Sequence, residues 1–295
     1  MKTDINKEKK LLKEPENEPE NPDFIWNKIK KSDGSDMHLL VSELRYVLSK
    51  NMHLSKMSII IEYINKISNG NKNVRILDYG SGGGQLVAFL HLIGYTNISA
   101  VDIYSEERVN GLNRLFSKAK MRGIIFYSYD KITLPFENDQ FDLIVSQQVI
   151  EHVSNIEQYI SECHRVLSRN GRALLDFPHK MVPFDTHTRM WFVHYFPIFI
   201  RKYFYDKYRD NERKQYFNFL YLRTPFFYNS LFKRVFDKVE DFTVDRISEF
   251  RYKDHYEGNR KLRGAIDKIF HLPIVGYFSL KIATFFVNKT VVLYK

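Results

Sequence analysis

A glycine-rich loop carries the strongest chemical signal in the chain. Residues 76–84 read Ile-Leu-Asp-Tyr-Gly-Ser-Gly-Gly-Gly, between an apolar run at 74–77 and a helical pattern at 85–93. Glycines let a backbone approach a ligand closely, and the N-terminus of a following helix aims N–H groups at it. The dinucleotide-binding fingerprint requires a further glycine at position 85, where this chain has Gln85. The loop therefore predicts a ligand-binding turn and leaves the ligand open.

An acidic residue follows at the end of the next apolar run. Asp102 closes the run 98–101 and comes 22 residues after Gly80. A carboxylate at this position accepts hydrogen bonds from both ribose hydroxyls of a nucleoside. The alternative is that Asp102 caps the helix that follows. The glycine loop favours the ribose interpretation, which fits a nicotinamide cofactor and an adenosyl cofactor equally well.

A third group of motifs separates these two cofactors. Its members are Asp130, Leu134-Pro135-Phe136, the run 141–145, Ile150-Glu151-His152-Val153 and the segment 165–171. In order and spacing they resemble the motifs of the class I S-adenosylmethionine-dependent methyltransferases, with a type 11-like core. The chain looks most like the branch that includes the quinone-biosynthesis methyltransferases, and the resemblance covers residues 74–178.

The resemblance implies S-adenosylmethionine as the cofactor and a binding role for ten residues. The methionine moiety would be held by Asp78, Gly80, Ser81, Gly82 and Gly84. The ribose would be held by Asp102, and the adenine amino group would meet Asp130, with Tyr129 or Ile103 against the ring. Gln147 would lie where the sulfonium and the acceptor meet.

The chain departs from the family pattern at two positions. Asn170-Gly171 stands where a Pro-Gly-Gly turn is commoner, which changes only a turn. Gln148 stands three residues before the Glu-His pair, where some quinone O-methyltransferases have a metal-binding glutamate. The single cysteine, Cys163, also excludes a cysteine-rich zinc site. We therefore expect no metal.

Transfer of the methyl group mainly requires alignment, because the positive sulfur already activates the methyl carbon. A hydroxyl acceptor also needs a base that removes its proton. The candidates are His152, His179, Asp185, His187 and His194. His187 is our first choice, oriented by Asp185, with the alternative that one of the two caps a helix. His152 is expected to begin the helix after 141–145, where a structural hydrogen bond is the favoured role and catalysis the other.

The acceptor is expected to bind near residues 178–197. This stretch follows the predicted strand 173–177, at the carboxyl edge of the sheet where substrates bind. It resembles, more weakly, a stretch in methyltransferases of bacterial surface-polysaccharide clusters. We therefore expect O-methylation of a saccharide or lipid-linked glycan hydroxyl. The alternatives are methylation of a quinone-type lipid ring and a non-catalytic cofactor-binding scaffold, against which the complete loop and Asp102 weigh.

Strand and helix patterns alternate between residues 74 and 178. Strands are expected at 74–77, 98–101, 124–127, 141–145 and 173–177, and helices at 85–93, 106–120 and 156–167. This alternation predicts an α/β fold with a doubly wound, mostly parallel, seven-stranded Rossmann-like sheet. The two remaining strands are expected at 244–250 and 291–294, the last returning into the sheet.

The chain divides into five expected segments. Their ranges and roles are 1–34, a disordered tail; 35–73, N-terminal helices at 37–50 and 55–67; 74–180, the cofactor-binding core; 181–240, a helical, acceptor-binding insertion or lid; and 241–295, strands and a helix that complete the sheet.

Charge and aromatic residues are concentrated near the end of the chain. Of a net charge of +10 and 45 aromatic residues, +9 and 29 fall in residues 181–295. We interpret this segment first as a lid that packs on the sheet and second as a surface that contacts an anionic membrane. RNA binding is the third interpretation, because the chain has no recognisable RNA-binding module. Residues 1–13 are rich in lysine and glutamate and contain no apolar block, so we expect no secretory signal. The chain also has no uninterrupted apolar run of roughly 18 residues, the length that spans a bilayer. We expect a cytoplasmic protein, with peripheral contact at the inner membrane face as the second reading and the oligomeric state open.

Overall fold

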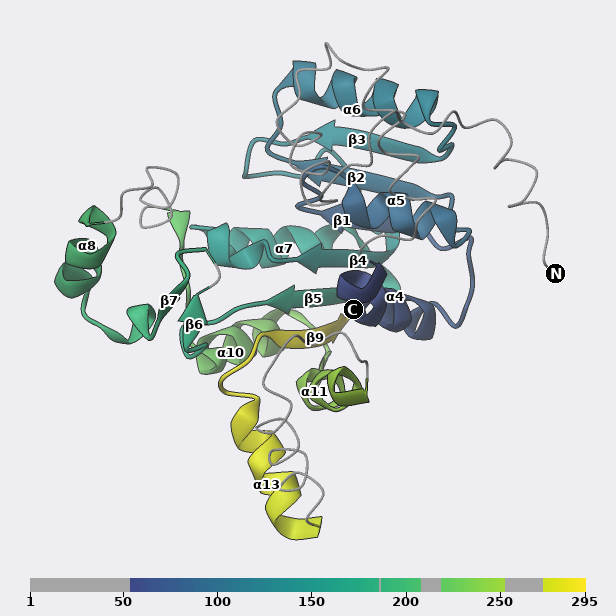
Figure 1. Cartoon of the computed structure of the whole chain (residues 1–295). Helices are drawn as coiled ribbons and strands as arrows, with labels where there is room; N and C mark the ends of the chain where they lie inside the picture. Colours follow the sequence, from purple (N-terminus) through teal and green to yellow (C-terminus); the bar gives the residue numbers. More distant parts are fainter. Residues whose placement is uncertain (1–53, 186, 208–218, 253–272) are drawn as a thin grey trace, which may run out of the picture. The chain divides into compact units, whose positions relative to one another are not determined.

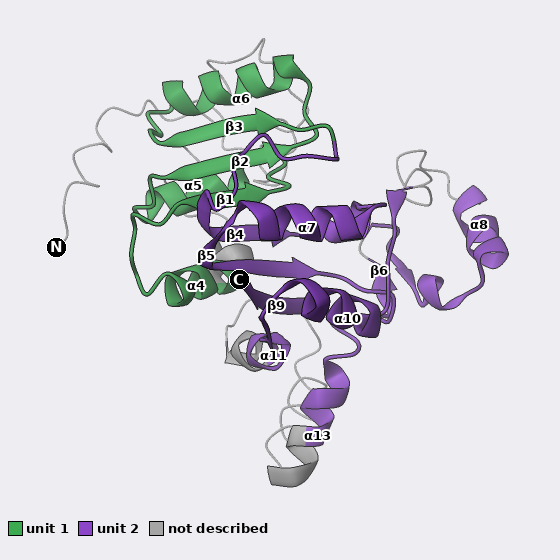
Figure 2. Ribbon diagram, turned by 180° about the vertical axis from the view of Figure 1, so that it is seen from behind, with its two compact units in different colours: residues 1–130 green, residues 131–295 purple. Residues whose placement is uncertain are grey.

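The computed structural model describes residues 54–185, 187–207, 219–252 and 273–295 (Figure 1). The chain falls into two compact units, residues 1–130 and residues 131–295 (Figure 2). The predicted tail at 1–34 and the predicted helix at 37–50 lie outside the described residues.

The described part of unit 1, residues 54–130, consists of three parallel strands and three helices. Its strands β1 (Ile76–Tyr79), β2 (Ile98–Asp102) and β3 (Ile124–Ser128) lie in the order β3-β2-β1. Helix α4 (Leu54–Ile67) precedes them, and α5 (Gln85–Leu92) and α6 (Glu106–Lys118) are the crossovers. All four residues of β1 are buried, as expected for a parallel strand that is covered on both faces.

The start of α6 is determined by its own sequence. The Ser105 side chain accepts a hydrogen bond from the backbone N–H of Arg108 at 3.2 Å, and Glu106 and Glu107 occupy the first turn. A serine cap and acidic residues satisfy the unpaired N–H groups at a helix N-terminus. Ser105 therefore caps α6, and Asp102 does not.

The described residues of unit 2 contribute four strands to the sheet, and the first two of these are parallel to each other. Strands β4 (Phe141–Gln147), β5 (Leu167–Phe177), β9 (Lys289–Tyr294) and β8 (Lys238–Asp241) lie in that order, and β9 is antiparallel to both neighbours. Helix α7 (Ile156–Val166) connects β4 to β5, α10 (Pro225–Val235) lies against α7, and α11 (Thr243–Tyr252) lies against β9. The remaining described elements are η2 (Ile150–His152), β6 (Phe184–Asp185), β7 (Met190–Trp191), η3 (Val193–Tyr195), α8 (Ile198–Asp206) and α13 (Pro273–Ala283).

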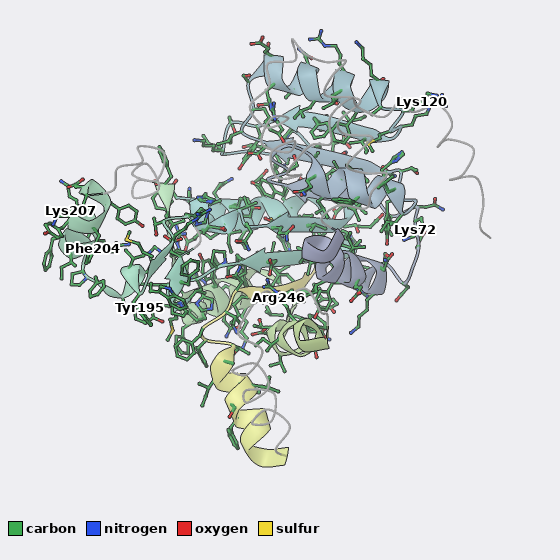
Figure 3. The ribbon with its side chains drawn as sticks, in the orientation of Figure 1. Lys72, Lys120, Tyr195, Phe204, Lys207 and Arg246 are labelled. Carbon is green, nitrogen blue, oxygen red and sulfur yellow. The ribbon has the colours of Figure 1, made fainter. Side chains whose placement is uncertain are left out.

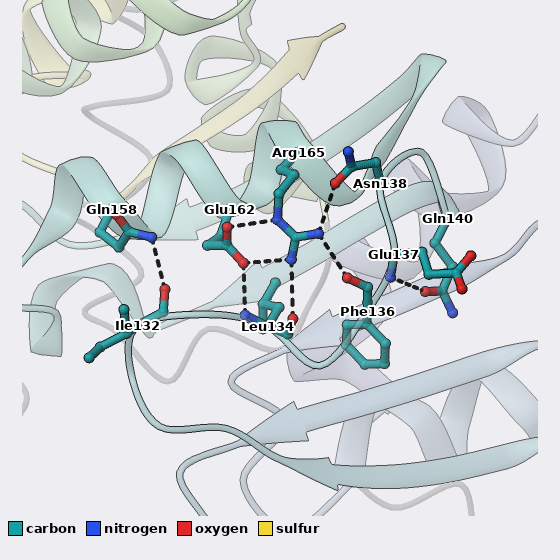
Figure 4. A network of polar contacts seen from close by, with 9 residues as sticks. All are labelled: Ile132, Leu134, Phe136, Glu137, Asn138, Gln140, Gln158, Glu162 and Arg165. Carbon is teal, nitrogen blue, oxygen red and sulfur yellow. Dashed lines mark hydrogen bonds and ion pairs between the residues drawn. The ribbon is translucent and has the colours of Figure 1, made fainter.

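Arg165 on α7 holds the loop that leads into β4 (Figure 4). Its guanidinium donates two hydrogen bonds to the Glu162 carboxylate, at 2.8 and 2.7 Å, and others to the carbonyls of Leu134 and Phe136. The same carboxylate accepts the backbone N–H of Leu134 at 2.7 Å. A bidentate arginine–carboxylate pair is among the stronger and more directional contacts in proteins. This contact explains why the Leu-Pro-Phe and Arg-Val-Leu motifs occur together.

The expected fold class is confirmed. The described strands of the two units form a seven-stranded sheet with flanking helices. The pairs β1–β2, β2–β3 and β4–β5 are parallel, and β9 is antiparallel to β5 and β8. The predicted helix 55–67 corresponds to α4, and the predicted terminal strand pairs with both β5 and β8. Among the described residues, no helix is long and apolar enough to cross a bilayer.

Two predicted elements are wrong. The segment 244–250 is not a strand but part of α11. Its apolar residues Val244 and Ile247 are three residues apart, which is a helical spacing. The Asp241 side chain also accepts the N–H of Thr243 at 2.9 Å, where the helix begins. The strand of this region is β8, just before it. His152 does not begin a helix either; it ends the short turn η2, and α7 begins at Ile156.

Candidate active site

The glycine loop of unit 1 has the conformation that its glycines permit. Gly80, Gly82 and Gly84 all have positive φ, of 91°, 55° and 83°. A side chain at Gly84 would also come within 2.8 Å of the buried rings of Phe116 and Phe126. Glycine is therefore required at position 84 both by the backbone angle and by the close approach of the loop to the core.

Asp102 closes this loop onto the end of β2. One carboxylate oxygen accepts the backbone N–H of Gly82 at 2.8 Å, and the other accepts the N–H of Ile103 at 2.7 Å. The loop is held from the other side by Val101, whose carbonyl accepts the N–H of Gly80 at 2.8 Å. A carboxylate has about four acceptor positions, so two remain available for ribose hydroxyls.

Asp78 is the buried acid of the loop. Its side chain lies at the end of β1 with a residue exposure of 3%, and its Oδ2 has no hydrogen-bond partner among the described residues. Burial, and next the negative charge of Asp102, raise the pKa of Asp78 to about 8. An unpaired buried carboxyl is costly, and a cationic ligand group beside it would remove that cost. The α-amino group of an amino-acid moiety is such a group.

Tyr104 is a site residue that our sequence reasoning missed. Its hydroxyl donates to the carbonyl of Gly82 at 2.5 Å and lies 2.8 Å from the Ser81 hydroxyl. Burial, and next the charge of Asp102, raise the pKa of Tyr104, so it remains a neutral donor. The available signal was its position two residues after Asp102. Tyr104 therefore fixes the loop that carries four of the predicted cofactor residues, Gly80, Ser81, Gly82 and Gly84.

The adenine-binding residues predicted from the sequence also lie in unit 1. Ile103 follows β2 with 52% of its surface exposed, as an accessible apolar wall for a ring would be. Tyr129 follows β3, donates its N–H to the Asp102 carbonyl at 3.2 Å and packs edge-on against Tyr79. Asp130 is exposed beside it. The carboxyl ends of β1, β2 and β3 thus present nine of the ten predicted cofactor residues.

Unit 2 contains the tenth, Gln147, at the end of β4, where it pairs in register with Asp176 of β5. The next residue, Gln148, has a positive φ of 56° and bonds to Asp176 twice, through its backbone N–H at 2.8 Å and its side-chain amide at 3.3 Å. Asp176 in turn accepts hydrogen bonds from Arg246 and Thr290. Gln148 is therefore engaged in holding the ends of β4 and β5 together.

The predicted base and its orienting residue meet in the β6–β7 hairpin of unit 2. The Nδ1 of His187 lies 3.2 Å from Asp185 Oδ1, and the backbone N–H of His187 donates to the same oxygen at 3.0 Å. The other oxygen, Oδ2, accepts the Thr188 hydroxyl at 2.6 Å and lies 3.3 Å from Nε2 of His194. Because a carboxylate only accepts, Nδ1 of His187 carries the proton and Nε2 carries the lone pair.

The negative charge of Asp185 is stabilised by the polar side chains around its carboxylate. Burial alone would raise its pKa, but hydrogen bonds from His187, His194 and Thr188 outweigh burial and hold the pKa well below the ordinary value. Asp185 is 6% exposed and His194 is buried beside it. A permanently ionised carboxylate is the partner that fixes a histidine tautomer and stabilises the imidazolium form when the ring takes up a proton.

His152 and Glu151 complete a cluster around His187. The rings of His152 and His187 are 5.0 Å apart and nearly perpendicular, and the Nδ1 of His152 lies 3.0 Å from the carbonyl of Phe219. Glu151 is fully buried, and neither carboxyl oxygen has a hydrogen-bond partner among the described residues. Burial raises the pKa of Glu151 to about 8. The three side chains offer ligand atoms within 4.8 Å of one another, so this is the place in the described chain where a metal ion could be held.

The remaining base candidate, His179, is separate from this cluster. It is fully buried, and burial lowers its pKa to about 4. A ring that stays neutral through the physiological range and has no exposed surface is poorly placed to take a proton from a substrate. The hairpin therefore brings together His187, Asp185 and His194, with His152 beside them.

Comparison with known proteins agrees with these features. Residues 77–175 match the family described as Methyltransferase domain. A ubiquinone biosynthesis O-methyltransferase of Rickettsia prowazekii is 31% identical over 140 residues, which cover 44% of this chain and 49% of that protein. The corresponding protein of Rickettsia canadensis is 29% identical over 127 residues, covering 43% and 52%. The chain thus spans about half the length of the curated relatives it matches.

A solved structure of similar fold is an S-adenosylmethionine-dependent methyltransferase from Mesorhizobium loti. It is 17% identical, with a TM-score of 0.45, and the match covers 76% of this chain and 91% of that one. The family match falls on the β1 loop, Asp102 and the motifs up to β5, which are the features from which the resemblance was drawn. Residues 77–175 of this chain therefore match a methyltransferase domain.

Proposed function

We propose that this protein transfers a methyl group from S-adenosylmethionine to a hydroxyl group by direct displacement. The observation that carries the proposal is the assembly at the strand ends of unit 1. There Asp102 closes a positive-φ glycine loop, beside the unpaired buried carboxyl of Asp78. A carboxylate for the ribose and a buried acid for an amino group are the two polar requirements of this cofactor. The cofactor, when bound, supplies the activated methyl carbon.

The base of the proposed reaction is His187 in unit 2. Its Nε2 would take the hydroxyl proton of the acceptor, and the charge that then develops on the ring would be stabilised by Asp185 through Nδ1. His194 and Thr188 hold Asp185 ionised and in place. His152 lies against the His187 ring and limits its rotation.

For the acceptor, the named relatives support the alternative more than our first expectation. Both are O-methyltransferases of ubiquinone biosynthesis, and neither name refers to a saccharide. We therefore propose an acceptor hydroxyl on a quinone-type lipid ring, with the saccharide or lipid-linked glycan as the second candidate. The exposed aromatic side chains of unit 2 suit an acceptor that carries an apolar tail.

The first test is binding of S-adenosylhomocysteine, followed by calorimetry. We expect the intact protein to bind with micromolar affinity. Asp102→Ala should weaken the binding free energy by about 1–3 kcal/mol, because the hydrogen bonds between the ribose hydroxyls and the charged carboxylate are lost. Asp130→Ala, which removes an exposed carboxylate, is the comparison variant, and we expect it to reduce the affinity less than Asp102→Ala does. Folded protein that releases no heat would leave the proposed enzyme without support.

The second test separates the acceptors. The protein is incubated with S-adenosylmethionine labelled in the methyl group and with two series of acceptors, prenylated catechols and nucleotide- or lipid-linked sugars. We expect label in the catechol series, on oxygen. Transfer only to the sugar series would restore the saccharide acceptor.

The third test concerns the base. His187→Ala should bind S-adenosylhomocysteine as the intact protein does and lose turnover by about 10²–10⁴-fold, the usual contribution of a general base. Asp185→Asn should lose less in kcat and shift the pH profile, because the ring loses its ionised partner. His91→Ala, on α5 of unit 1, serves as a control histidine substitution. Unchanged turnover in His187→Ala would move the base elsewhere.

A further inference from the structure

The segment 191–207 exposes an unusual amount of apolar surface. It comprises β7 from Trp191, η3 and α8. Trp191, Ile198 and Phe199 are 63%, 64% and 71% exposed, and Tyr203 is 56% exposed. Single exposed apolar residues are ordinary on a protein surface, but this many within one short segment mark a binding surface.

The segment is not part of the core of unit 2. Of the residues in α8 only Tyr205 is buried, at 3% exposure. Among the described elements, none makes an extensive packing contact with α8. Figure 2 shows α8 projecting from unit 2 beyond β6, away from the strands β4, β5 and β9. The aromatic side chains therefore do not form a closed lid on the unit that carries them.

Basic side chains are interleaved with these aromatic ones. Arg201, Lys202 and Lys207 outnumber the single acid of the segment, Asp206. Lys207 lies 4.2 Å from the centre of the Tyr203 ring, and Figure 3 shows it with Phe204 at the outer end of α8. Helix α8 carries tyrosine and phenylalanine with arginine and lysine, and Trp191 precedes it on β7. Aromatic side chains together with lysine and arginine are typical of segments that lie in a membrane interface.

The charge distribution also selects among occupants. Lysine is depleted in protein–protein interfaces, whereas anionic lipid headgroups attract it. Lys202 and Lys207 are both exposed within the aromatic surface. We propose that residues 191–207 bind peripherally to an anionic lipid surface, with Trp191, Ile198 and Phe199 inserted among the headgroups and the basic side chains contacting the phosphates.

The test is co-sedimentation of the full chain with vesicles. Vesicles of phosphatidylcholine with phosphatidylglycerol are compared with vesicles of phosphatidylcholine alone. We expect binding to the mixed vesicles, at least a tenfold weaker binding to the neutral ones, and release by 0.5 M salt, because salt screens the lipid charge. Absence of binding to mixed vesicles would overturn the proposal.

Two variants identify the residues. The double variant Trp191→Ser, Phe199→Ser should lose at least tenfold in vesicle affinity, and Lys202→Glu, Lys207→Glu should abolish the preference for anionic lipid. The matched control is Ile125→Ser, Ile132→Ser, which removes apolar side chains that are 50% and 62% exposed outside this segment. The control should bind vesicles as the intact protein does.

The competing occupants give different results. If the surface instead joins two copies of this chain, light scattering will show a dimer that Trp191→Ser, Phe199→Ser dissociates, and vesicle binding will be equal in all variants. Binding of S-adenosylhomocysteine without vesicles should be the same in all variants. Loss of vesicle binding with cofactor binding intact therefore reports on this surface alone, whatever the outcome for the proposed reaction.

Discussion

At the scale of single residues, the buried carboxyl of Asp78 makes the stability of the protein depend on pH. Its pKa is about 8 when buried, against 3.8 for an ordinary aspartate. Between these pH values the folded protein keeps a proton that the unfolded chain releases. The free energy of unfolding therefore falls as pH rises through this range, by about 1.4 kcal/mol for each unit of pKa difference.

The corresponding prediction is made for the cofactor-free protein. Asp78→Asn cannot ionise, so its free energy of unfolding should fall less than that of the intact protein between pH 5 and pH 8. Urea denaturation at the two pH values measures this difference. Asp130→Asn, a neutralisation at an exposed position, should behave as the intact protein does. Parallel pH dependence of Asp78→Asn and the intact protein would show that Asp78 is ionised in the folded state.

A second residue-scale prediction concerns the metal. Glu151, His152 and His187 could hold an ion, but the side chain of Gln148, three residues before Glu151, is an amide that bonds to Asp176. Burial also raises the pKa of Glu151, and a protonated carboxyl has to lose its proton before it can bind an ion. We expect turnover to persist after dialysis against EDTA. Turnover that EDTA abolishes and Mn²⁺ restores would show that these three side chains bind an ion.

At the scale of elements, the contact between α7 and the loop 131–140 depends on Arg165. Removal of the guanidinium leaves the carboxylate of Glu162, with 7% of its side chain exposed, without its charged partner. We expect Arg165→Ala to lower the free energy of unfolding by about 2–4 kcal/mol, as the loss of one member of a largely buried pair does.

The chain offers a matched control for this change. Arg234 also pairs with a glutamate of α7, Glu157, but both side chains are more than half exposed. Arg234→Ala should cost less than about 1 kcal/mol, because water solvates and screens such a pair. Urea denaturation of the two variants gives the comparison. Equal losses would mean that burial of Glu162 does not determine the strength of its pair.

At the scale of the whole chain, β9 joins segments that are distant in sequence. Leu293 is fully buried and pairs with Ala173 of β5 on one side and Val239 of β8 on the other. Leu293→Ala should lower the free energy of unfolding by about 2–5 kcal/mol, because the removed methyl groups leave a cavity in the core.

The control for this substitution is Ile125→Ala, on β3, where half of the side-chain surface is already in water. We expect it to cost less than Leu293→Ala by at least about 1 kcal/mol, since less apolar surface is exposed by the change. A thermal denaturation series measures both. If Leu293→Ala changes the free energy of unfolding only slightly, the stability of unit 2 depends on β4 and β5 and not on β9.

The elements of unit 1 could be read from the sequence because their signals are local. The alternation of strands and helices, the glycines of the loop and the acid after β2 all act within about 30 residues of chain. For the same reason Asp102 was assigned before the contact of its carboxylate with Gly82 was known. Local spacing failed at 244–250, where apolar residues three apart were taken for a strand and form α11.

By itself the sequence determined the α/β class, the glycine loop and Asp102 at the strand ends, and the His187–Asp185 pair, because neighbouring residues and their spacing set these features. Only the tertiary structure decided that the buried carboxyl of Glu151 has no hydrogen-bond partner among the described residues, that Tyr104 fixes the loop and that His194 reaches Asp185. Each of these depends on which segments the fold brings together, and burial and contact are properties of that arrangement, which the residue types do not contain.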